Sequence, residues 1–214
     1  MTSEIRHSIL ENSLKLAGFA VIAALLLGTV YTVSEDRIIE QRIKAERLAL
    51  NAILPPSRHD NDLINDTFML DLEGNEFRRI DLLGLRENSR AYIARQNSRV
   101  SALIFPLIAR DGYNGDINLL LAVNTDGTVD GVRVTAHRET PGLGDKIDLR
   151  LSDWILAFNG RSLTNPNPEG WTVVKNKGDF DQFTGATITP RAVTIAIANG
   201  LEFFQANKAL LLSL

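Results

Sequence analysis

The chain has 214 residues, of which 44% are hydrophobic and 23% are charged, and its formal net charge is −3. This length predicts one sizeable domain with an appendage, and the composition is that of a globular protein. The basic residues are scattered, which argues against a nucleic-acid partner. The absence of cysteine excludes thiolate catalysis, disulfides and iron–sulfur ligation. The histidines are too dispersed for a His-pair metal motif, so redox chemistry would need an organic cofactor.

The N-terminal region contains a candidate membrane anchor, preceded by a short tail at 1–15. Residues 16–33 (LAGFAVIAALLLGTVYTV) carry no charge, and a helix of this length spans about 27 Å, close to the thickness of the hydrocarbon core. A cleaved secretory signal is the alternative. The apolar run is longer than usual for such a signal, and no A-x-A-like site follows it. The sequence therefore predicts a retained transmembrane helix.

Basic residues flank this span on both sides. Arg6 and Lys15 precede it, and Arg37, Arg42, Lys44 and Arg47 follow it. A count of these charges would place the C-terminal domain in the cytoplasm. The difference is small, so the charge pattern alone leaves the orientation open.

Residues 34–56 predict a second helix that leaves the membrane. Ser34 is a suitable N-cap, acidic residues follow it in the first turn, and Pro55 and Pro56 end the run. One face of this helix carries Ile39, Ile43, Leu50 and Leu54. We expect that face to pack on the chain's own domain.

The remaining domain, at about 60–214, is predicted to be α+β. The expected elements are a buried strand at 99–109, a β-hairpin at 117–137, a short strand at 171–175 and a helix from Pro190 onward. Asp126-Gly127 supplies the hairpin turn, and Asp130-Gly131 supplies a bulge. The helix has an apolar stripe made of Val193, Ala196, Ile197, Gly200 and Phe204. Strands followed by a terminal helix favour an α+β arrangement.

The stretch DQFTGATITP (181–190) places three threonines around Gly185-Ala186 and before a proline. If Pro190 is the first helical residue, Thr189 is the N-cap. The start of the helix then offers free N–H groups and a positive dipole end to a phosphate. The hydroxyls of Thr187 and Thr184 stay available. The alternative is an ordinary glycine-containing turn before a capped helix.

A second motif, HRETPGLGDKI (137–147), follows the hairpin. Gly142 and Gly144 permit unusual φ values or a close approach of the backbone to a ligand. The motif is neither a dinucleotide fingerprint nor a P-loop. The alternative is an ordinary loop with a type II turn at Pro141-Gly142, in which His137 is a structural residue.

Together the two motifs resemble those of a known family. DQFTGAT (181–187) is similar to the flavin-transferase target pattern D-G-x-(S/T)-G-A-T, whose last threonine is esterified to the phosphate of FMN. Gln182 stands where that pattern usually has glycine. HRETPGLG (137–144) resembles the H-x-E-T-P-G-L-G segment of the same FMN-binding domain. With its anchor and length, the chain resembles over nearly its whole extent the G subunits of Rnf (also called Rsx) ion-translocating electron transport complexes.

The resemblance implies an FMN-binding domain with an antiparallel sheet and flanking helices, behind a single N-terminal transmembrane helix. It implies that a flavin transferase attaches FMN to Thr187 as a phosphoester. The residues expected around the cofactor are Thr184, Gly185 and Ala186 in the turn, and Glu139, Thr140, Gly142 and Leu143 near the ring or the ribityl chain.

The resemblance further implies an electron carrier that performs no bond rearrangement of its own, within a translocase-type complex. Its expected partners are the other subunits of that complex and the lipid bilayer of a bacterial inner membrane. The family also implies a single-pass chain with a periplasmic domain, against the count of basic residues. Three alternatives stay open: the C subunit of the sodium-pumping NADH:quinone reductase, a membrane-anchored regulatory flavin module, and a structural assembly subunit with an unmodified turn.

Overall fold

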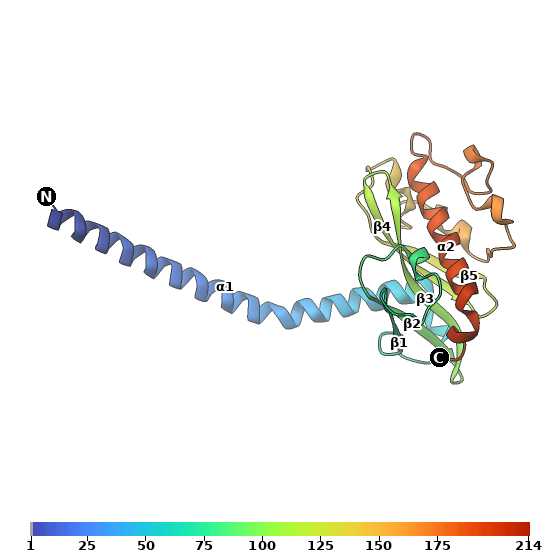
Figure 1. Ribbon diagram of the computed structural model, residues 1–214, viewed down its shortest axis with the longest axis horizontal. Coiled ribbons are helices and arrows are strands. Elements are labelled where there is room, and N and C mark those ends of the chain that lie inside the picture. The colour runs from blue at the N-terminus through green and yellow to red at the C-terminus, as the bar shows by residue number, and fades with distance from the viewer. Residues whose placement is uncertain (1) are drawn as a thin grey trace. The chain divides into compact units, whose positions relative to one another are not determined.

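The computed structural model describes the backbone of residues 2–214, and the side chains of this range except those of 2–6, 36 and 42. The chain forms two compact units, a first that ends at Glu46 and a second at Arg47–Leu214. Helix α1 (Thr2–Ile53) contributes to both units as one continuous helix (Figure 1).

Helix α1 passes the length and composition test for a membrane-spanning helix. Its most apolar 18-residue window has a mean hydropathy of 2.2, and none of that window is buried. The predicted break at Ser34 is wrong, because Ser34 lies in the interior of α1. An N-cap residue begins a new helix only when the backbone at that residue is not helical, and no proline or paired glycine precedes Ser34 to interrupt α1. Pro55 does end the run, since α1 stops at Ile53.

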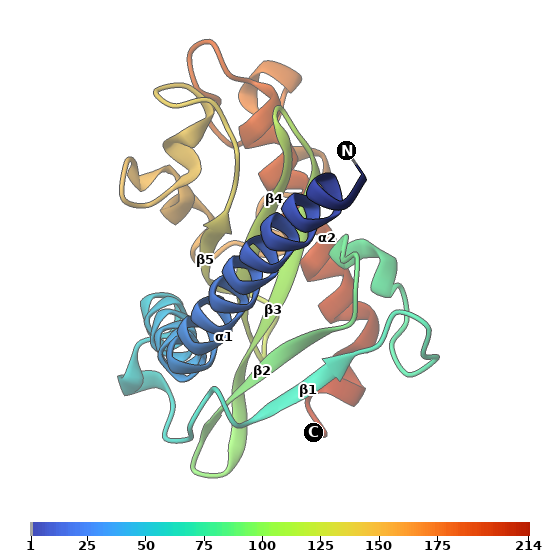
Figure 2. The ribbon, with the colours of Figure 1, turned by 90° about the vertical axis from the view of Figure 1, so that its left-hand side faces the viewer.

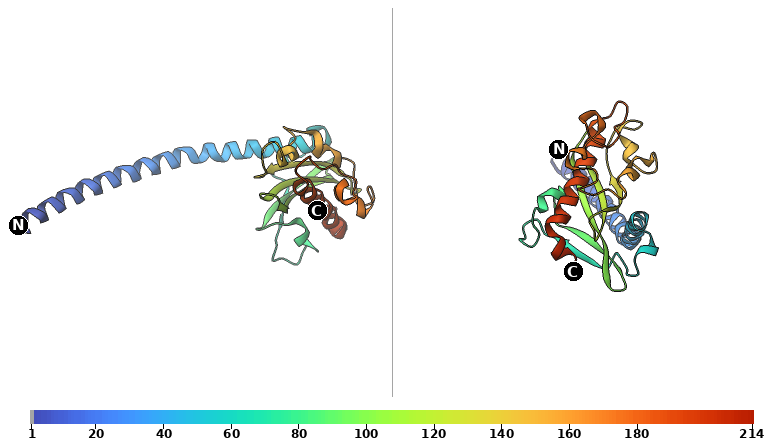
Figure 3. Two further views of the ribbon diagram at one scale, coloured as in Figure 1. Left: turned by 90° about the horizontal axis from the view of Figure 1, so that it is seen from above. Right: turned by 90° about the vertical axis from the view of Figure 1, so that its right-hand side faces the viewer.

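The second unit is built on an antiparallel sheet of five strands in the order β1-β2-β3-β4-β5. The strands are β1 (Thr67–Leu70), β2 (Ser89–Gln96), β3 (Arg99–Gly112), β4 (Gly115–Asn124) and β5 (Val129–Ala136). Helix α2 (Ile188–Leu211) lies along one face of this sheet (Figures 2 and 3). The expected α+β fold with an antiparallel sheet is therefore confirmed.

Each face of the sheet has its own core, because successive side chains of a strand point to opposite faces. Leu103 and Phe105 of β3 belong to the larger core, under α2. Ile104 belongs to the smaller core on the other face, with Leu50 near the end of α1 and Leu54 just after it. Of the predicted apolar face, Leu50 and Leu54 thus pack on the chain's own domain, whereas Ile39 and Ile43 are exposed.

The position of α2 depends on one glycine of the predicted stripe. A Cβ atom at Gly200 would lie 2.7 Å from Leu121 Cδ2 and 3.1 Å from both Cδ atoms of Leu107. The absence of a side chain therefore lets α2 approach β3 and β4 closely. The Phe105 and Phe203 rings meet edge to face nearby, with centroids 5.5 Å apart.

The hairpin prediction is confirmed by β4 and β5. Ala122 pairs with Gly131 and Val123 with Val129, so Asp130 is the extra residue of a bulge. The strand predicted at 171–175 is wrong. Val173 forms only an isolated bridge with Phe180, and a short 3₁₀ helix follows at Val174–Asn176. β-Branched residues favour a strand only where a partner strand is available, and this segment has none.

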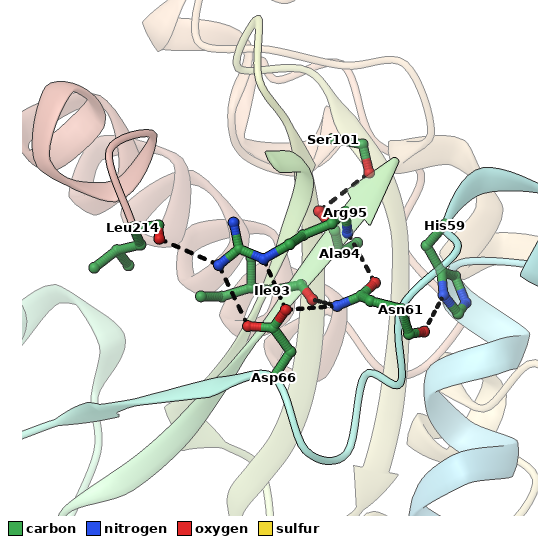
Figure 4. A network of polar contacts seen from close by, with 8 residues as sticks. All are labelled: His59, Asn61, Asp66, Ile93, Ala94, Arg95, Ser101 and Leu214. Atoms are coloured by element: carbon green, nitrogen blue, oxygen red, sulfur yellow. Dashed lines mark hydrogen bonds and ion pairs between the residues drawn. The ribbon is translucent and has the colours of Figure 1, made fainter. Parts of the chain in front are cut away.

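A polar network fixes the segment between α1 and β1 (Figure 4). The Asn61 side-chain amide donates to Ile93 O at 2.7 Å and accepts from the Arg95 N–H at 2.9 Å. The Arg95 guanidinium in turn donates to Asp66 Oδ2 at 2.7 Å and to Leu214 O at 3.2 Å. The segment between α1 and β1 forms no strand before Thr67, and the side chains of Asn61 and Asp66 connect it to β2.

Candidate functional site

The predicted acceptor segment, residues 181–187, turns sharply and then enters α2. The Ala186 N–H donates to Phe183 O at 3.0 Å, and Gly185 has a φ of 82°, a conformation that favours glycine. Helix α2 begins at Ile188, so the N-cap is Thr187 and the prediction of Thr189 is wrong. Pro190 lies within the first turn, where its missing N–H has no intrahelical acceptor to lose.

The hydroxyl of Thr187 is free even though this residue is the N-cap. It makes no capping hydrogen bond. Within the described residues, the amides of Thr187, Ile188 and Thr189 also lack acceptors, and the first bonded amide is that of Arg191, which donates to Thr187 O at 3.3 Å. The N-terminus of this 24-residue helix therefore presents unpaired N–H groups and a positive dipole end.

The second motif forms the facing loop, after β5. Gly142 has a φ of 77°, and the Leu143 N–H donates to Thr140 O at 3.1 Å, as in a type II turn. His137 Nδ1 accepts the Glu139 N–H at 3.2 Å, so His137 has the structural contact considered as its alternative role. Glu139 is buried, and its carboxylate accepts hydrogen bonds from the Thr189 hydroxyl and the Asn114 N–H.

These segments enclose a cavity of about 270 Å³. It is lined by Tyr113, Glu139, Thr140, Leu143, Gly144, Gly185, Ala186, Thr187, Ile188 and Thr189. Six of the eight predicted site residues are among these, while Thr184 and Gly142 lie outside the lining. The structure thus brings the two motifs together, with the candidate acceptor Thr187 in the wall.

Four lining residues were missed by the sequence prediction of the site. Two of them are Tyr113, from the β3–β4 turn, and Ile188, from the first turn of α2. They are joined in the lining by Leu143, a predicted residue from the loop after β5. The side chains of Tyr113, Leu143 and Ile188 are 65%, 42% and 42% exposed. They give the cavity an apolar rim that can pack against a flat ring. The other two missed residues, Gly144 and Thr189, lie at its inner wall.

The predicted acceptor segment also makes contacts with Trp154 and with the loop that contains Lys175. The Trp154 Nε1–H donates to Asp181 O at 2.7 Å, and the Trp154 ring meets the Phe183 ring edge to face at 5.1 Å. Gln182 Oε1 accepts the Lys175 N–H at 3.1 Å. Gln182, which departs from the family pattern, therefore binds the preceding loop and does not line the cavity.

A charged pair follows the second motif. The side-chain hydrogen bond from Arg150 lowers the pKa of Asp148 below its usual value, and the Arg150 N–H bond and the His137 ring act in the same direction. Burial of Asp148, which is 8% exposed, acts in the opposite direction on its pKa, but the hydrogen bonds from Arg150 outweigh it. This pair stabilises the end of the loop that carries Glu139.

Comparisons with known proteins agree with the two motifs. Residues 112–202 match the FMN-binding domain family, and residues 1–53 match the RnfG N-terminal region. The chain is 43% identical to the G subunit of the ion-translocating oxidoreductase complex of Vibrio cholerae serotype O1 (strain M66-2), covering 92% of this chain and 90% of that protein. It is 44% identical to the protein of the same name from Pseudomonas aeruginosa (strain UCBPP-PA14), covering 100% and 96%.

A third relative of the same name, from Shewanella amazonensis, is 43% identical over 96% of this chain and 92% of its own length. These relatives match the chain along both units, which decides between the two subunit families left open by the motifs. The chain belongs to the family of G subunits of ion-translocating oxidoreductase complexes.

Proposed function

We propose that this chain is the electron-carrier subunit of a membrane-bound ion-translocating oxidoreductase complex, and that it holds FMN through a phosphoester to Thr187. The observation that carries the proposal is the free Thr187 hydroxyl in the wall of the cavity, at the N-terminus of α2. The family match to an FMN-binding domain supports the cofactor.

The residues of the cavity fit FMN on chemical grounds. A phosphate group is stabilised by unpaired helix N–H groups and by the helix dipole, and the amides of Thr187, Ile188 and Thr189 provide both. Gly185 and Ala186 leave room beside the acceptor oxygen. The apolar rim of Tyr113, Leu143 and Ile188 would exclude water from one side of the ring. Bound FMN would supply reversible electron transfer, for which the protein provides position and surroundings.

We also propose how the chain is placed in the cell. A flavin transferase attaches FMN, α1 crosses the lipid bilayer of the bacterial inner membrane once over residues 16–33, and the FMN-binding domain, from about residue 60, lies in the periplasm. The partners are the other subunits of the complex named for the relatives.

The periplasmic placement can be tested by labelling a cysteine. Because the chain has no cysteine, Glu73→Cys introduces a single thiol on an exposed side chain. A membrane-impermeant maleimide should label it in intact spheroplasts; labelling only after lysis would contradict the periplasmic placement.

The attachment is tested by the intact mass and the in-gel flavin fluorescence of the denatured chain, after co-expression with a flavin transferase. Wild type should gain the mass of FMN minus one water. Thr187→Val, which removes the hydroxyl and retains the shape, should lose both signals. It should change the free energy of unfolding by less than about 0.5 kcal/mol, because the Thr187 side chain makes no capping hydrogen bond.

Thr172→Val is the matched control, since Thr172 is half-buried like Thr187 but lies outside the motif and does not line the cavity. It should retain the mass gain and the fluorescence. If the Thr187→Val variant still carried covalent flavin, the attachment site would have to be another residue. An unmodified wild-type chain beside an active transferase would instead favour a structural subunit with an ordinary turn.

A further inference from the structure

Glu139 and Thr189 form a buried polar pair beside the acceptor. Their exposed fractions are 4% and 1%. The Thr189 hydroxyl donates to Glu139 Oε2, and the Asn114 N–H donates to Glu139 Oε1 at 3.0 Å. Each carboxylate oxygen therefore accepts a hydrogen bond from another segment of the site, which ties Glu139 to both of them.

Two glycines allow this pair to fit. A Cβ atom at Gly144 would lie 2.8 Å from Thr189 Oγ1 and 2.9 Å from Glu139 Oε2, and one at Gly112 would lie 3.0 Å from Glu139 Oε1. Real Cβ atoms essentially never approach other atoms to less than 3.0 Å. The backbone therefore encloses the carboxylate closely on two sides.

The pair joins three segments that are distant in sequence. Asn114 lies in the β3–β4 turn, Glu139 in the loop after β5, and Thr189 in the first turn of α2, with separations of 25 and 50 residues. Asn114 also donates through its side chain to the Thr140 hydroxyl at 3.1 Å. The same three segments supply the lining of the cavity, so this pair determines how its walls meet.

We infer that Glu139 and Thr189 are positioning residues that fix the start of α2 and thereby keep the Thr187 hydroxyl free for FMN attachment. An N-cap threonine ordinarily accepts an N–H of the first turn, which would engage the acceptor oxygen. Here the restraint comes from Thr189, two residues further on, and a carboxylate near a helix N-terminus also interacts favourably with the dipole. The role given to Thr187 rests on the proposed function.

The test compares Thr189→Val with Thr194→Val in the full-length chain. Both substitutions remove one buried hydroxyl from α2 and retain the shape of the side chain. Thr194 is the matched control because it is 0% exposed, donates only to Pro190 O of its own helix at 2.8 Å, and does not line the cavity. Thr189→Ser restores the donor and serves as the rescue variant.

The first measurement needs no flavin. Hydrogen exchange is followed at the amides of residues 191–193, the first in α2 with helical acceptors. Thr189→Val should speed their exchange by about tenfold or more, because the first turn then opens independently of the rest. Thr194→Val and Thr189→Ser should exchange as wild type does. Equal exchange in Thr189→Val and wild type would overturn the inference.

The second measurement is the single-turnover rate of FMN attachment by a flavin transferase. Thr189→Val should slow attachment by about tenfold or more, since a small displacement of a reacting group has effects of that size, while the final yield is retained. Faster exchange with an unchanged attachment rate would make the pair merely structural and overturn the positioning role. If wild type itself takes no FMN, the proposed function fails, and the exchange comparison still decides whether the pair holds α2.

Glu139→Gln provides a second variant should Thr189→Val fold poorly. It retains the shape of the side chain and one acceptor oxygen, but its NH₂ group cannot accept from Thr189 or Asn114. We expect severalfold slower attachment together with faster exchange at 191–193. Wild-type values of both quantities in this variant would also overturn the inference.

Discussion

The close packing of the second motif predicts a specific effect of Gly144→Ala. Gly144 does not have a positive φ, so alanine can adopt its backbone conformation. The added methyl group would nevertheless lie 2.8 Å from Thr189 Oγ1, 2.9 Å from Glu139 Oε2 and 3.0 Å from Glu139 Cβ. One member of the buried pair must therefore move, and the hydrogen bond between Thr189 and Glu139 must lengthen or break.

The size of the effect follows from these contacts. One extra methyl group in a closely packed region costs about 1–3 kcal/mol. A buried carboxylate that loses a donor costs about 1–3 kcal/mol more. A small shift of Thr189 or Glu139 would reduce both the steric cost and the hydrogen-bond cost, so the two do not add in full. We therefore expect Gly144→Ala to lower the free energy of unfolding by about 2–4 kcal/mol and to slow FMN attachment.

Gly142→Ala is the control within the same loop. No atom lies within 4 Å of a Cβ built at Gly142, but its φ is 77°, so alanine would be strained by about 1–2 kcal/mol without a clash. Urea unfolding followed by tryptophan fluorescence measures both variants, because Trp154 and Trp171 are the only tryptophans and both lie in the second unit. A stable Gly144→Ala, or a greater loss in Gly142→Ala, would refute the packing argument.

Three substitutions test other contacts. Asn207→Ala removes an amide that accepts from the Arg78 N–H at 2.7 Å and donates to Arg78 O at 2.8 Å; urea unfolding should show a loss of about 2–4 kcal/mol, and a loss under about 1 kcal/mol contradicts the bonds. Hydrogen bonds from Arg150 lower the pKa of Asp148 in the folded chain. The contribution of Asp148 to folding stability is therefore complete above its pKa in the unfolded chain, which is about 4, and is lost as the pH falls through its lower pKa in the folded chain. Asp148→Asn should flatten the loss of stability below about pH 4, and an unchanged acid profile counts against this assignment. Gln182→Gly loses the bond to the Lys175 N–H and should cost about 1 kcal/mol without slowing FMN attachment by intact mass; slower attachment would give Gln182 a role at the acceptor.

The parts of the fold that the sequence predicted are those with strong local patterns. The run of apolar residues in β3, the Asp-Gly turn of the β4–β5 hairpin and the apolar stripe of α2 each determine their element locally. Strands β1 and β2 had no such pattern, since β1 has only four residues and the apolar run of β2 between Arg90 and Arg95 is equally short. Their pairing depends on partners elsewhere in the chain, such as Asn61, which bonds to Ile93 and Arg95.

The same physical reason explains which residues of the site the sequence could predict and which it could not. Thr187, Gly185 and Ala186 lie within a recognisable motif, so a local pattern located them. Nothing local indicates that Tyr113 lines the cavity, or that the Thr189 hydroxyl meets a carboxylate 50 residues earlier in the chain. Both contacts result from the way in which the sheet, the loop after β5 and α2 pack together, and no spacing rule encodes them.

The position of Thr187, the proposed acceptor, is determined at two points of one helix. At Gly200, close approach to Leu107 and Leu121 fixes α2 against the sheet. At Thr189, the bond to Glu139 fixes its first turn. Eleven residues of helix separate these points by about 16 Å, so contacts near the start and at the middle of α2 together resist its sliding and rotation. The Thr187 hydroxyl, just beyond the second point, is therefore held in place by contacts that do not engage it, as a modification site requires.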